Sequence, residues 1–352
     1  PINSIAAMAF GAGIMLTPNA MAAIEFIGAL PRVQSWGVTP DRSVSRHYLT
    51  GEVLGERRVA GAYEADYGRP MYNIHRADLH RALAEVVAVD GKTEVHLNHT
   101  FVSLTRRENE LNISFANGQS YAGDVVIGAD GIRSAVRRIA LGFDSPPRFT
   151  NFVAWRGLVP VDSLPDRLRS VSMSSWVSPD RHIIEYTVGG LKNYVALALQ
   201  PGWQSESWST PSSIEEVLEV FPGWHQDVTT IIKSTPAGGS YKFALFDRDP
   251  LPQWSKGLVT LLGDAAHPML PLMAQGAAMG LEDAVVLARA FEVSDSPAEA
   301  LNRYESARLR YKAVAAEEKA DLRLFGWRVA VDDRKCLIGH PILNDVGRQD
   351  RK

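Results

Sequence analysis

One segment of the chain shows the clearest change in the pattern of hydrophobic and polar positions. A continuous apolar run over residues 258–262, ended by Gly263, predicts a buried strand of a parallel sheet. Pro268 and Pro271 follow, and because proline does not fit a helix interior, they predict a stiff, irregular connection. Over residues 276–291 the apolar residues recur at helical spacing. The segment therefore predicts a strand, a rigid loop and a helix, in that order.

The polar residues of this segment fall where such a unit binds ligands. Asp264 comes directly after the predicted strand, at the strand end where open α/β sheets hold their ligands. Free N–H groups near Gly276 and Ala277, at the start of the predicted helix, favour a group with negative charge. The small residues there also allow a flat ring to approach the backbone. An ordinary corner with an exposed aspartate is the alternative, and the residues alone leave both open.

Residues 11–16, GAGIML, begin like a dinucleotide-binding fingerprint but do not complete it. Leucine stands where the third glycine belongs, and no strand ending in an acidic residue follows about 20 residues later. The Thr-Pro pair at 17–18 is instead typical of an N-cap and a first helical position. We expect a helix from Pro18 that Gly28 and Pro31 end.

Other parts of the chain alternate between strand and helix patterns. Strands are expected within 44–75, at 93–97, 99–107, 111–115 and 125–127, and repeatedly between 148 and 246, where they predict an antiparallel sheet. Helices are expected from about Ala77, after residue 131, and over 214–221 and 298–320. Asn117-Gly118 predicts a tight turn.

Composition narrows the class of protein. The 352 residues, 45% of them hydrophobic, suffice for a large core in two domains or one elaborate domain. A net charge of −3 with 22% charged residues predicts neither a nucleic-acid nor a membrane partner. The apolar start, residues 5–16, is too short to span a bilayer. The single cysteine, Cys336, excludes an intrachain disulfide and fits a cytoplasmic protein, and no metal site is predicted.

The segment 263–284, GDAAHPMLPLMAQGAAMGLEDA, resembles the Gly-Asp motif of FAD-dependent aromatic hydroxylases. These are single-component flavoprotein monooxygenases, such as salicylate and 6-hydroxynicotinate hydroxylases. Four further blocks are similar to motifs of that family: HRADL at 75–79, ADGIRSAVR at 129–137, AWRGLVP at 154–160 and YESAR at 304–308. The resemblance extends from Gly11 to about Leu324.

The resemblance implies a set of residues that hold FAD. The implied cofactor-binding residues are Arg76, Val102, Asp130, Gly131, Gly263, Asp264, Gly276 and Ala277. In the family the aspartate of Gly-Asp binds the ribityl chain, and the later Gly-Ala backbone faces the pyrimidine end of the flavin. Asp130 is the implied contact to both FAD and the nicotinamide nucleotide. Alternatives are that Arg76 is a solvated charge, that Val102 is a core residue of a strand, and that Arg133 and Arg137 are exposed on a helix rather than steering the nucleotide.

Two residues are candidates for the chemistry. By resemblance Tyr186 faces the substrate, where it would orient or deprotonate a phenol, although most strand tyrosines only pack. The same resemblance implies that Pro271 lies at the boundary of flavin and substrate, where its carbonyl would accept a proton in a relay. His47 is interpreted as structural. Met15 stands where 6-hydroxynicotinate enzymes carry histidine, which argues weakly against that substrate.

The implied fold is α/β, with a doubly wound FAD-binding domain and an inserted, mostly antiparallel β-sheet substrate domain. We expect the FAD-binding domain at 1–43, 70–147 and 247–331, the substrate domain at 44–69 and 148–246, and a tail at 332–352. The implied activity is hydroxylation of a small phenolic or heteroaromatic acid with O2 and NADH or NADPH, through a flavin C4a-hydroperoxide. A homodimer is one option for the assembly.

The largest departure from the family pattern lies before residue 11. The family's first block, a βαβ unit of about 30 residues with the G-x-G-x-x-G turn, is missing. We expect the protein to be longer than this chain. The alternative is a non-catalytic, truncated remnant of the fold that does not bind FAD. A flavin halogenase is disfavoured, because its W-x-W-x-I-P motif is not found.

Overall fold

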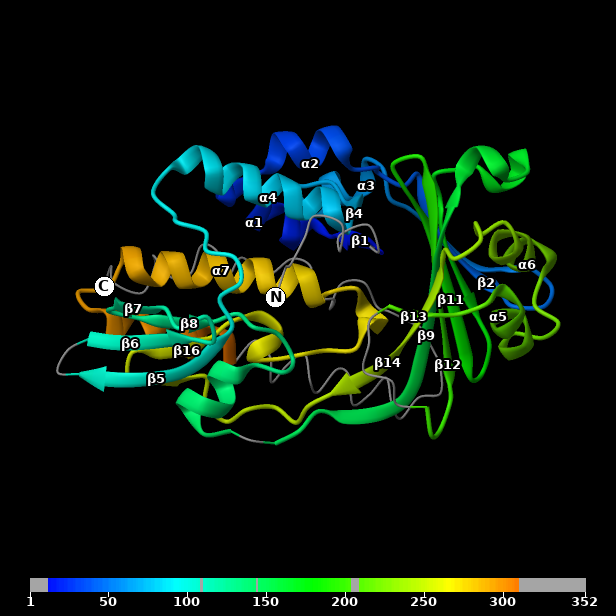
Figure 1. Ribbon diagram of the computed structural model, residues 1–352. Coiled ribbons are helices and arrows are strands. Elements are labelled where there is room, and N and C mark those ends of the chain that lie inside the picture. The colour runs from blue at the N-terminus through cyan, green and yellow to red at the C-terminus, as the bar shows by residue number, and fades with distance from the viewer. Residues whose placement is uncertain (1–11, 108–109, 144, 204–208, 310–352) are drawn as a thin grey trace. The chain divides into compact units, whose positions relative to one another are not determined.

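The computed structural model describes residues 12–107, 110–143, 145–203 and 209–309 (Figure 1). The chain divides into two compact units. Unit 1 comprises Lys92–Arg148 and Asp247–Lys352 with Pro1–Ile5, and unit 2 comprises Ala6–Gly91 and Phe149–Phe246. The predicted α/β class is confirmed. No helix within the described ranges has both the length and the apolar character needed to cross a bilayer.

Unit 1 contains two small sheets and the helices that pack on them. One sheet has the order β15 (Ser255–Lys256), β16 (Val259–Leu261), β8 (Val126–Gly128), and the other has the order β5 (Phe101–Arg107), β6 (Glu110–Phe115), β7 (Ser120–Gly123). The helical elements are η2 (Arg137–Leu141), η5 (Gly263–Ala265), η6 (Pro271–Met273), α7 (Gly276–Glu292) and residues 297–309. A shared apolar core includes Val126, Val259, Leu261, Trp254 and Tyr304.

Strands β8 and β16 are parallel, and this fixes where the loops after them lie. Leu261 pairs with Gly128, so both strands end at the same edge of the sheet. Gly128 is required there, because a Cβ would lie 2.8 Å from Val136 and 2.9 Å from Leu261 Cδ2. The loops that begin at Ala129 and Leu262 therefore leave the sheet side by side, as expected for a ligand-binding edge of an α/β sheet.

Unit 2 is built on an eight-stranded sheet. Its order is β13 (Thr210–Pro211), β14 (Ser240–Asp247), β9 (Arg148–Pro160), β12 (Leu191–Leu199), β11 (Arg181–Val188), β10 (Met173–Val177), β2 (Arg42–His47), β3 (Val53–Arg58). Antiparallel pairing from β9 to β10 confirms the predicted antiparallel sheet, while β10 and β2 are parallel. Helices α5 (Ile214–Val220) and α6 (Gln226–Lys233) supply apolar residues to a core with Trp155 and Trp176.

The first part of unit 2 is a two-stranded ribbon with helices. Strand β1 (Gly13–Leu16) pairs antiparallel with β4 (Tyr72–His75). The helices are α1 (Pro18–Ile27), α2 (Leu30–Trp36), α3 (Ala62–Tyr67) and α4 (Arg76–Asp90). Strand β1 crosses close to β11, because a Cβ on Gly13 would lie 2.5 Å from the ring of Tyr186.

The predicted helices at Pro18, Ala77 and Gly276 are confirmed to within one residue. Pro31 does not end the first helix but stands in the first turn of α2, a position that proline tolerates. Residues 93–97 are not a strand, and β7 is the third strand of that sheet instead. The helix expected after residue 131 is confirmed over residues 135–141, and its last five residues form the π-helical segment η2. The predicted helix at 298–320 is described only to residue 309, and Cys336 and the tail lie outside the described residues.

Candidate functional site

The carboxyl edge of β8 and β16 brings two predicted motifs together. Asp130 and Gly131 follow β8, and Gly263 and Asp264 form η5 directly after β16. The N–H of Leu262 donates to the carbonyl of Gly128 at 2.9 Å, which extends the pairing to the point where the loops begin. Both predicted aspartates therefore lie on adjacent loops of one edge.

Asp264 is exposed, whereas its neighbours Gly263 and Ala265 are buried. The turn depends on Gly263, whose φ of 60° lies in the left-handed region that glycine favours. The Cβ built on Gly263 lies 3.7 Å from the Cα of Gly280 in α7, so the turn packs against that helix. The backbone thus directs the Asp264 carboxylate outward at the strand end.

Asp130 is held by local hydrogen bonds. Its Oδ1 accepts from the Ser134 hydroxyl at 2.5 Å, and its Oδ2 accepts from the backbone N–H groups of Ala135 and Val136 at 2.7 and 3.1 Å. The carboxylate therefore caps the turn that follows β8. Gly131, with a φ of 76° and no heavy atom within 4 Å of a built Cβ, leaves the backbone open beside it.

Arg137 joins the two loops. Its Nη1 donates to the Ala265 carbonyl at 3.0 Å and its Nη2 donates to the Ile132 carbonyl at 2.6 Å. The side chain is 2% exposed, so the interpretation of Arg137 as an exposed helical charge is wrong. Burial lowers the pKa of this guanidinium. Arg133, by contrast, is exposed.

The start of α7 offers bare backbone. The N–H groups of Gly276 and Ala277 lie in the first turn, where a helix supplies no carbonyl partner. A Cβ on Gly276 would meet nothing closer than Met269 Cγ at 3.6 Å, so packing within the protein does not require glycine there. A flat ring could therefore lie against this backbone. Together with the outward Asp264, this open cradle fits FAD.

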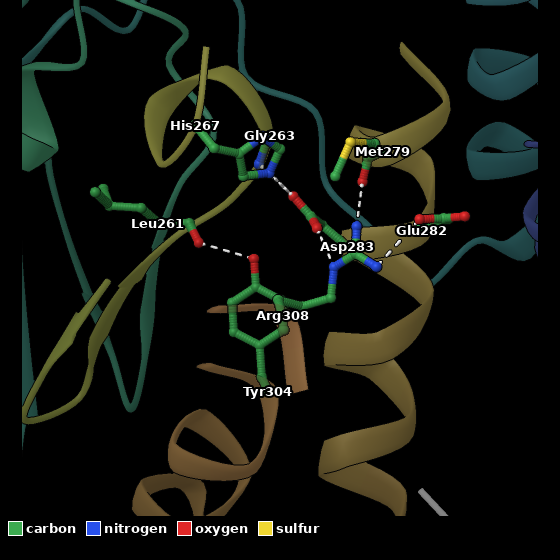
Figure 2. Close-up of polar contacts among 8 residues, drawn as sticks. All are labelled: Leu261, Gly263, His267, Met279, Glu282, Asp283, Tyr304 and Arg308. Atoms are coloured by element: carbon green, nitrogen blue, oxygen red, sulfur yellow. Dashed lines mark hydrogen bonds and ion pairs between the residues drawn. The ribbon is translucent and has the colours of Figure 1, made fainter. Parts of the chain in front are cut away.

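A buried ionic cluster lies beneath the Gly263 turn (Figure 2). Asp283 accepts from the N–H of Gly263 at 3.0 Å and from Arg308 Nε at 2.5 Å, and it contacts His267 Nε2. Asp283 and Arg308 are both fully buried. Burial raises the pKa of Asp283 to about 6, against the opposing effect of Arg308. The sequence placed Asp283 on the helix and Arg308 in a motif, but gave no signal that they meet.

Two further predicted residues of unit 1 are located as follows. Val102 is 49% exposed, so the alternative of a core residue is wrong for its side chain. The register passes from Phe101 opposite Phe115 to Ser103 opposite Ser114, which makes Val102 the extra residue of a β-bulge. Pro271 begins η6, and its carbonyl accepts from the N–H of Ala274 at 3.2 Å.

The remaining predicted residues belong to unit 2. Arg76 is the first residue of α4, and its exposed guanidinium has no hydrogen bond or ion pair among the described residues. Tyr186 lies on β11 and is 4% exposed. Burial raises the pKa of its phenol well above the usual range, which keeps the hydroxyl protonated at neutral pH. Tyr186 is therefore suited to donate a hydrogen bond rather than to remove a proton.

Sequence reasoning did not single out several polar residues near Tyr186. Asn193 is its register partner on β12 and accepts from the N–H of Gly13 at 3.1 Å. His182 lies on the same face of β11, and burial lowers its pKa to about 4, so it is neutral. Arg156 on β9 is buried, and burial together with the charge of Arg76 lowers its pKa to about 10. The four-residue spacing of His182 and Tyr186 places both on one face of a strand, but the sequence does not show which strands bring Asn193 and Arg156 beside them.

The open edge of a parallel pair, with an exposed aspartate and an uncovered helix start, defines an α/β protein with a ligand-binding edge. A family model described as FAD binding domain matches residues 7–319. The chain belongs to the FAD-dependent aromatic hydroxylase family, as its motifs predicted.

Similar proteins carry activities of one kind in their names. The chain is 37% identical over 302 residues to a 3-amino-4-hydroxybenzoate 2-monooxygenase of Streptomyces platensis, covering 85% of this chain and 74% of the relative. It is 32% identical over 342 residues to a 6-hydroxynicotinate 3-monooxygenase of Pseudomonas fluorescens, covering 95% of this chain and 86% of the relative. A salicylate hydroxylase in complex with its substrate has a TM-score of 0.76 at 29% identity, covering 92% of this chain and 84% of that one.

Proposed function

We propose that the chain is a monooxygenase that uses FAD, NADH or NADPH, and O2 to hydroxylate a small aromatic acid. One observation carries the proposal: the turn that carries the exposed Asp264 packs against α7, because a Cβ on Gly263 would lie 3.7 Å from the Cα of Gly280, and the first turn of α7 has open backbone at Gly276. This arrangement suits the ribityl hydroxyls and the ring of a flavin. The relatives, which are 37% and 32% identical to this chain over the aligned residues, are named for such reactions.

The residues that would hold FAD in unit 1 have distinct tasks. Asp264 would accept hydrogen bonds from the ribityl hydroxyls, and the N–H groups of Gly276 and Ala277 would donate to the polar edge of the ring. The bulge at Val102 leaves backbone available for the adenine. Asp130 and Gly131 shape the neighbouring loop, where the exposed Arg133 would attract a nicotinamide nucleotide. FAD, when bound, supplies the electron transfer and the activation of O2.

Unit 2 would bind the aromatic acid. The protonated Tyr186 would donate a hydrogen bond to a ring substituent, and so orient the ring. The carbonyl of Pro271 in unit 1 accepts one hydrogen bond from the N–H of Ala274, and its second lone pair would accept a hydrogen bond in a proton relay. Positive charge from Arg156 in unit 2 suits the carboxylate that the names of the relatives imply, whereas Arg76 stays a proposed contact of FAD.

Steady-state assays test this proposal. The chain is mixed with FAD, NADH or NADPH and a set of hydroxybenzoates and hydroxynicotinates, while nucleotide oxidation and product are followed together. We expect one aromatic acid to stimulate nucleotide oxidation and to yield a hydroxylated product in equal amount. A chain that binds no flavin and oxidises no nucleotide would instead support the alternative of a non-catalytic remnant.

A further inference from the structure

The buried cluster around Asp283 connects two elements that are distant in sequence (Figure 2). One carboxylate oxygen accepts from the N–H of Gly263, and the other accepts from Nε of Arg308. Gly263 belongs to the turn that carries Asp264, whereas Arg308 belongs to the helix at residues 297–309. A single side chain from α7 thus bridges the predicted cofactor turn and this helix.

The helix at residues 297–309 makes a second contact just before this turn, at the end of β16. The hydroxyl of Tyr304 donates to the carbonyl of Leu261 at 3.0 Å, two residues before Gly263. Tyr304 and Arg308 are four residues apart, so they lie on one face of the helix. Arg308 also donates to Glu282 Oε2 at 3.1 Å and to the carbonyl of Met279 at 3.3 Å. The helix therefore holds both the end of β16 and the first part of α7.

If Asp283 and Arg308 served only to fill the core, apolar residues of similar size could replace them. A buried ion pair often adds no stability over apolar residues of similar volume, because desolvation opposes the attraction. What apolar residues could not provide is an acceptor for the N–H of Gly263. That N–H stands at the turn with a φ of 60°, and the next residue is Asp264. The carboxylate of Asp283 therefore fixes the peptide that aims Asp264, and Arg308 fixes the carboxylate.

We propose that Arg308, acting through Asp283, is a positioning residue for the Gly263–Asp264 turn, so that docking of helix 297–309 and FAD binding are coupled. The coupling to FAD binding rests on the proposed function, whereas the positioning of the turn does not. Linkage is reciprocal: if the docked helix strengthens FAD binding by some factor, then FAD strengthens docking of the helix by the same factor. His267, in the loop after the Gly263 turn, also holds this carboxylate. Its Nε2 contacts Oδ2 of Asp283, the oxygen that accepts from the N–H of Gly263.

Amide hydrogen exchange tests the positioning without any cofactor. Arg308→Met removes the cation, and Arg308→Lys keeps a charge with fewer donors. The control is Arg303→Met, which removes an arginine on the same helix that pairs with Glu299 and is 32% exposed. Arg308→Met is expected to speed exchange at residues 261–266 by about tenfold or more relative to the control, with partial rescue by lysine. Equal exchange in the Met variants at positions 308 and 303 would overturn the inference.

FAD titration tests the coupling. Arg308→Met is expected to weaken FAD binding at least about tenfold relative to Arg303→Met, and FAD is expected to slow exchange over 297–309 in the wild type. Tyr304→Phe, which deletes only a hydroxyl, provides a milder variant and is expected to act in the same direction. Unchanged FAD affinity in folded Arg308 variants would overturn the coupling. A wild-type chain that binds no FAD would instead overturn the proposed function, and the exchange result would still decide the positioning.

Discussion

At the scale of single residues, burial decides what the polar side chains can do. Asp264 is exposed at the strand end, while Asp130 and Asp283 accept hydrogen bonds from backbone N–H groups. Tyr186 is buried and protonated, and His182 is buried and neutral. Burial thus separates the side chains that hold the structure from those that we propose to meet a ligand.

Tyr186→Phe tests the donor assigned to the substrate side. The variant removes one hydroxyl and keeps the ring, so packing against Gly13 is preserved. Loss of a hydrogen bond to the ring substituent is expected to lower kcat/KM for the aromatic acid about tenfold, at about 1.4 kcal/mol per factor of ten. Flavin affinity is expected to stay unchanged. Wild-type kcat/KM in the variant would leave Tyr186 a packing residue.

His182 predicts a specific dependence of stability on pH. Its pKa is about 4 in the folded protein, because burial disfavours the charged imidazolium, against about 6.5 in the unfolded chain. The folded state therefore binds fewer protons between these values, and the free energy of unfolding falls as the pH drops from about 6.5 to 4. The fall amounts to up to about 3 kcal/mol for this residue.

Denaturant unfolding of wild type and His182→Gln between pH 4 and 7 measures this contribution. The variant is expected to lose less stability on acidification. The difference isolates His182, because Asp283, whose raised pKa acts with the opposite sign, is present in both proteins. Parallel pH curves would show that His182 takes up its proton as easily in the folded state as in the unfolded one.

At the scale of elements, the glycine that ends β8 and the glycine that begins α7 have different tasks. Gly128 allows close packing against Val136 and Leu261, whereas Gly276 meets only Met269 at 3.6 Å. Gly128→Ala is expected to lower the free energy of unfolding by about 1–3 kcal/mol through overpacking. Gly276→Val is expected to leave stability nearly unchanged and to weaken FAD binding, because the side chain would fill the cradle. Equal flavin affinity in Gly276→Val and wild type would remove the start of α7 from the site.

The elements also show what the sequence could and could not predict. The strand before Gly263, the helix from Gly276 and the turn at Asn117-Gly118 follow from local pattern and turn chemistry, and these predictions are confirmed. Residues 93–97 alternate like a strand but find no partner strand, because β7 pairs with β6 instead. The strand pattern is local, whereas pairing depends on distant parts of the chain.

For the whole molecule, motifs predicted the family but not the interactions that support the site. The sequence left Arg137 either a residue that steers the nucleotide or a solvated charge on a helix, yet it is buried and joins the loops after β8 and β16. The bridge from Gly263 through Asp283 to Arg308 involves residues up to 45 positions apart, so no local pattern could reveal it. A one-dimensional pattern indicates which face a residue occupies, but not what it meets there.

The most direct test of the account is a titration of FAD into the wild-type chain and Asp264→Ala, followed by the visible difference spectrum. The control is Asp124→Ala, which removes an exposed aspartate before β8, at the opposite end of that strand. The account predicts a saturable spectral change in wild type and control, and binding at least about tenfold weaker in Asp264→Ala, as expected for lost hydrogen bonds to a carboxylate. No saturable change in the wild type, or equal affinity in all three proteins, would contradict the assignment of this edge as the flavin site.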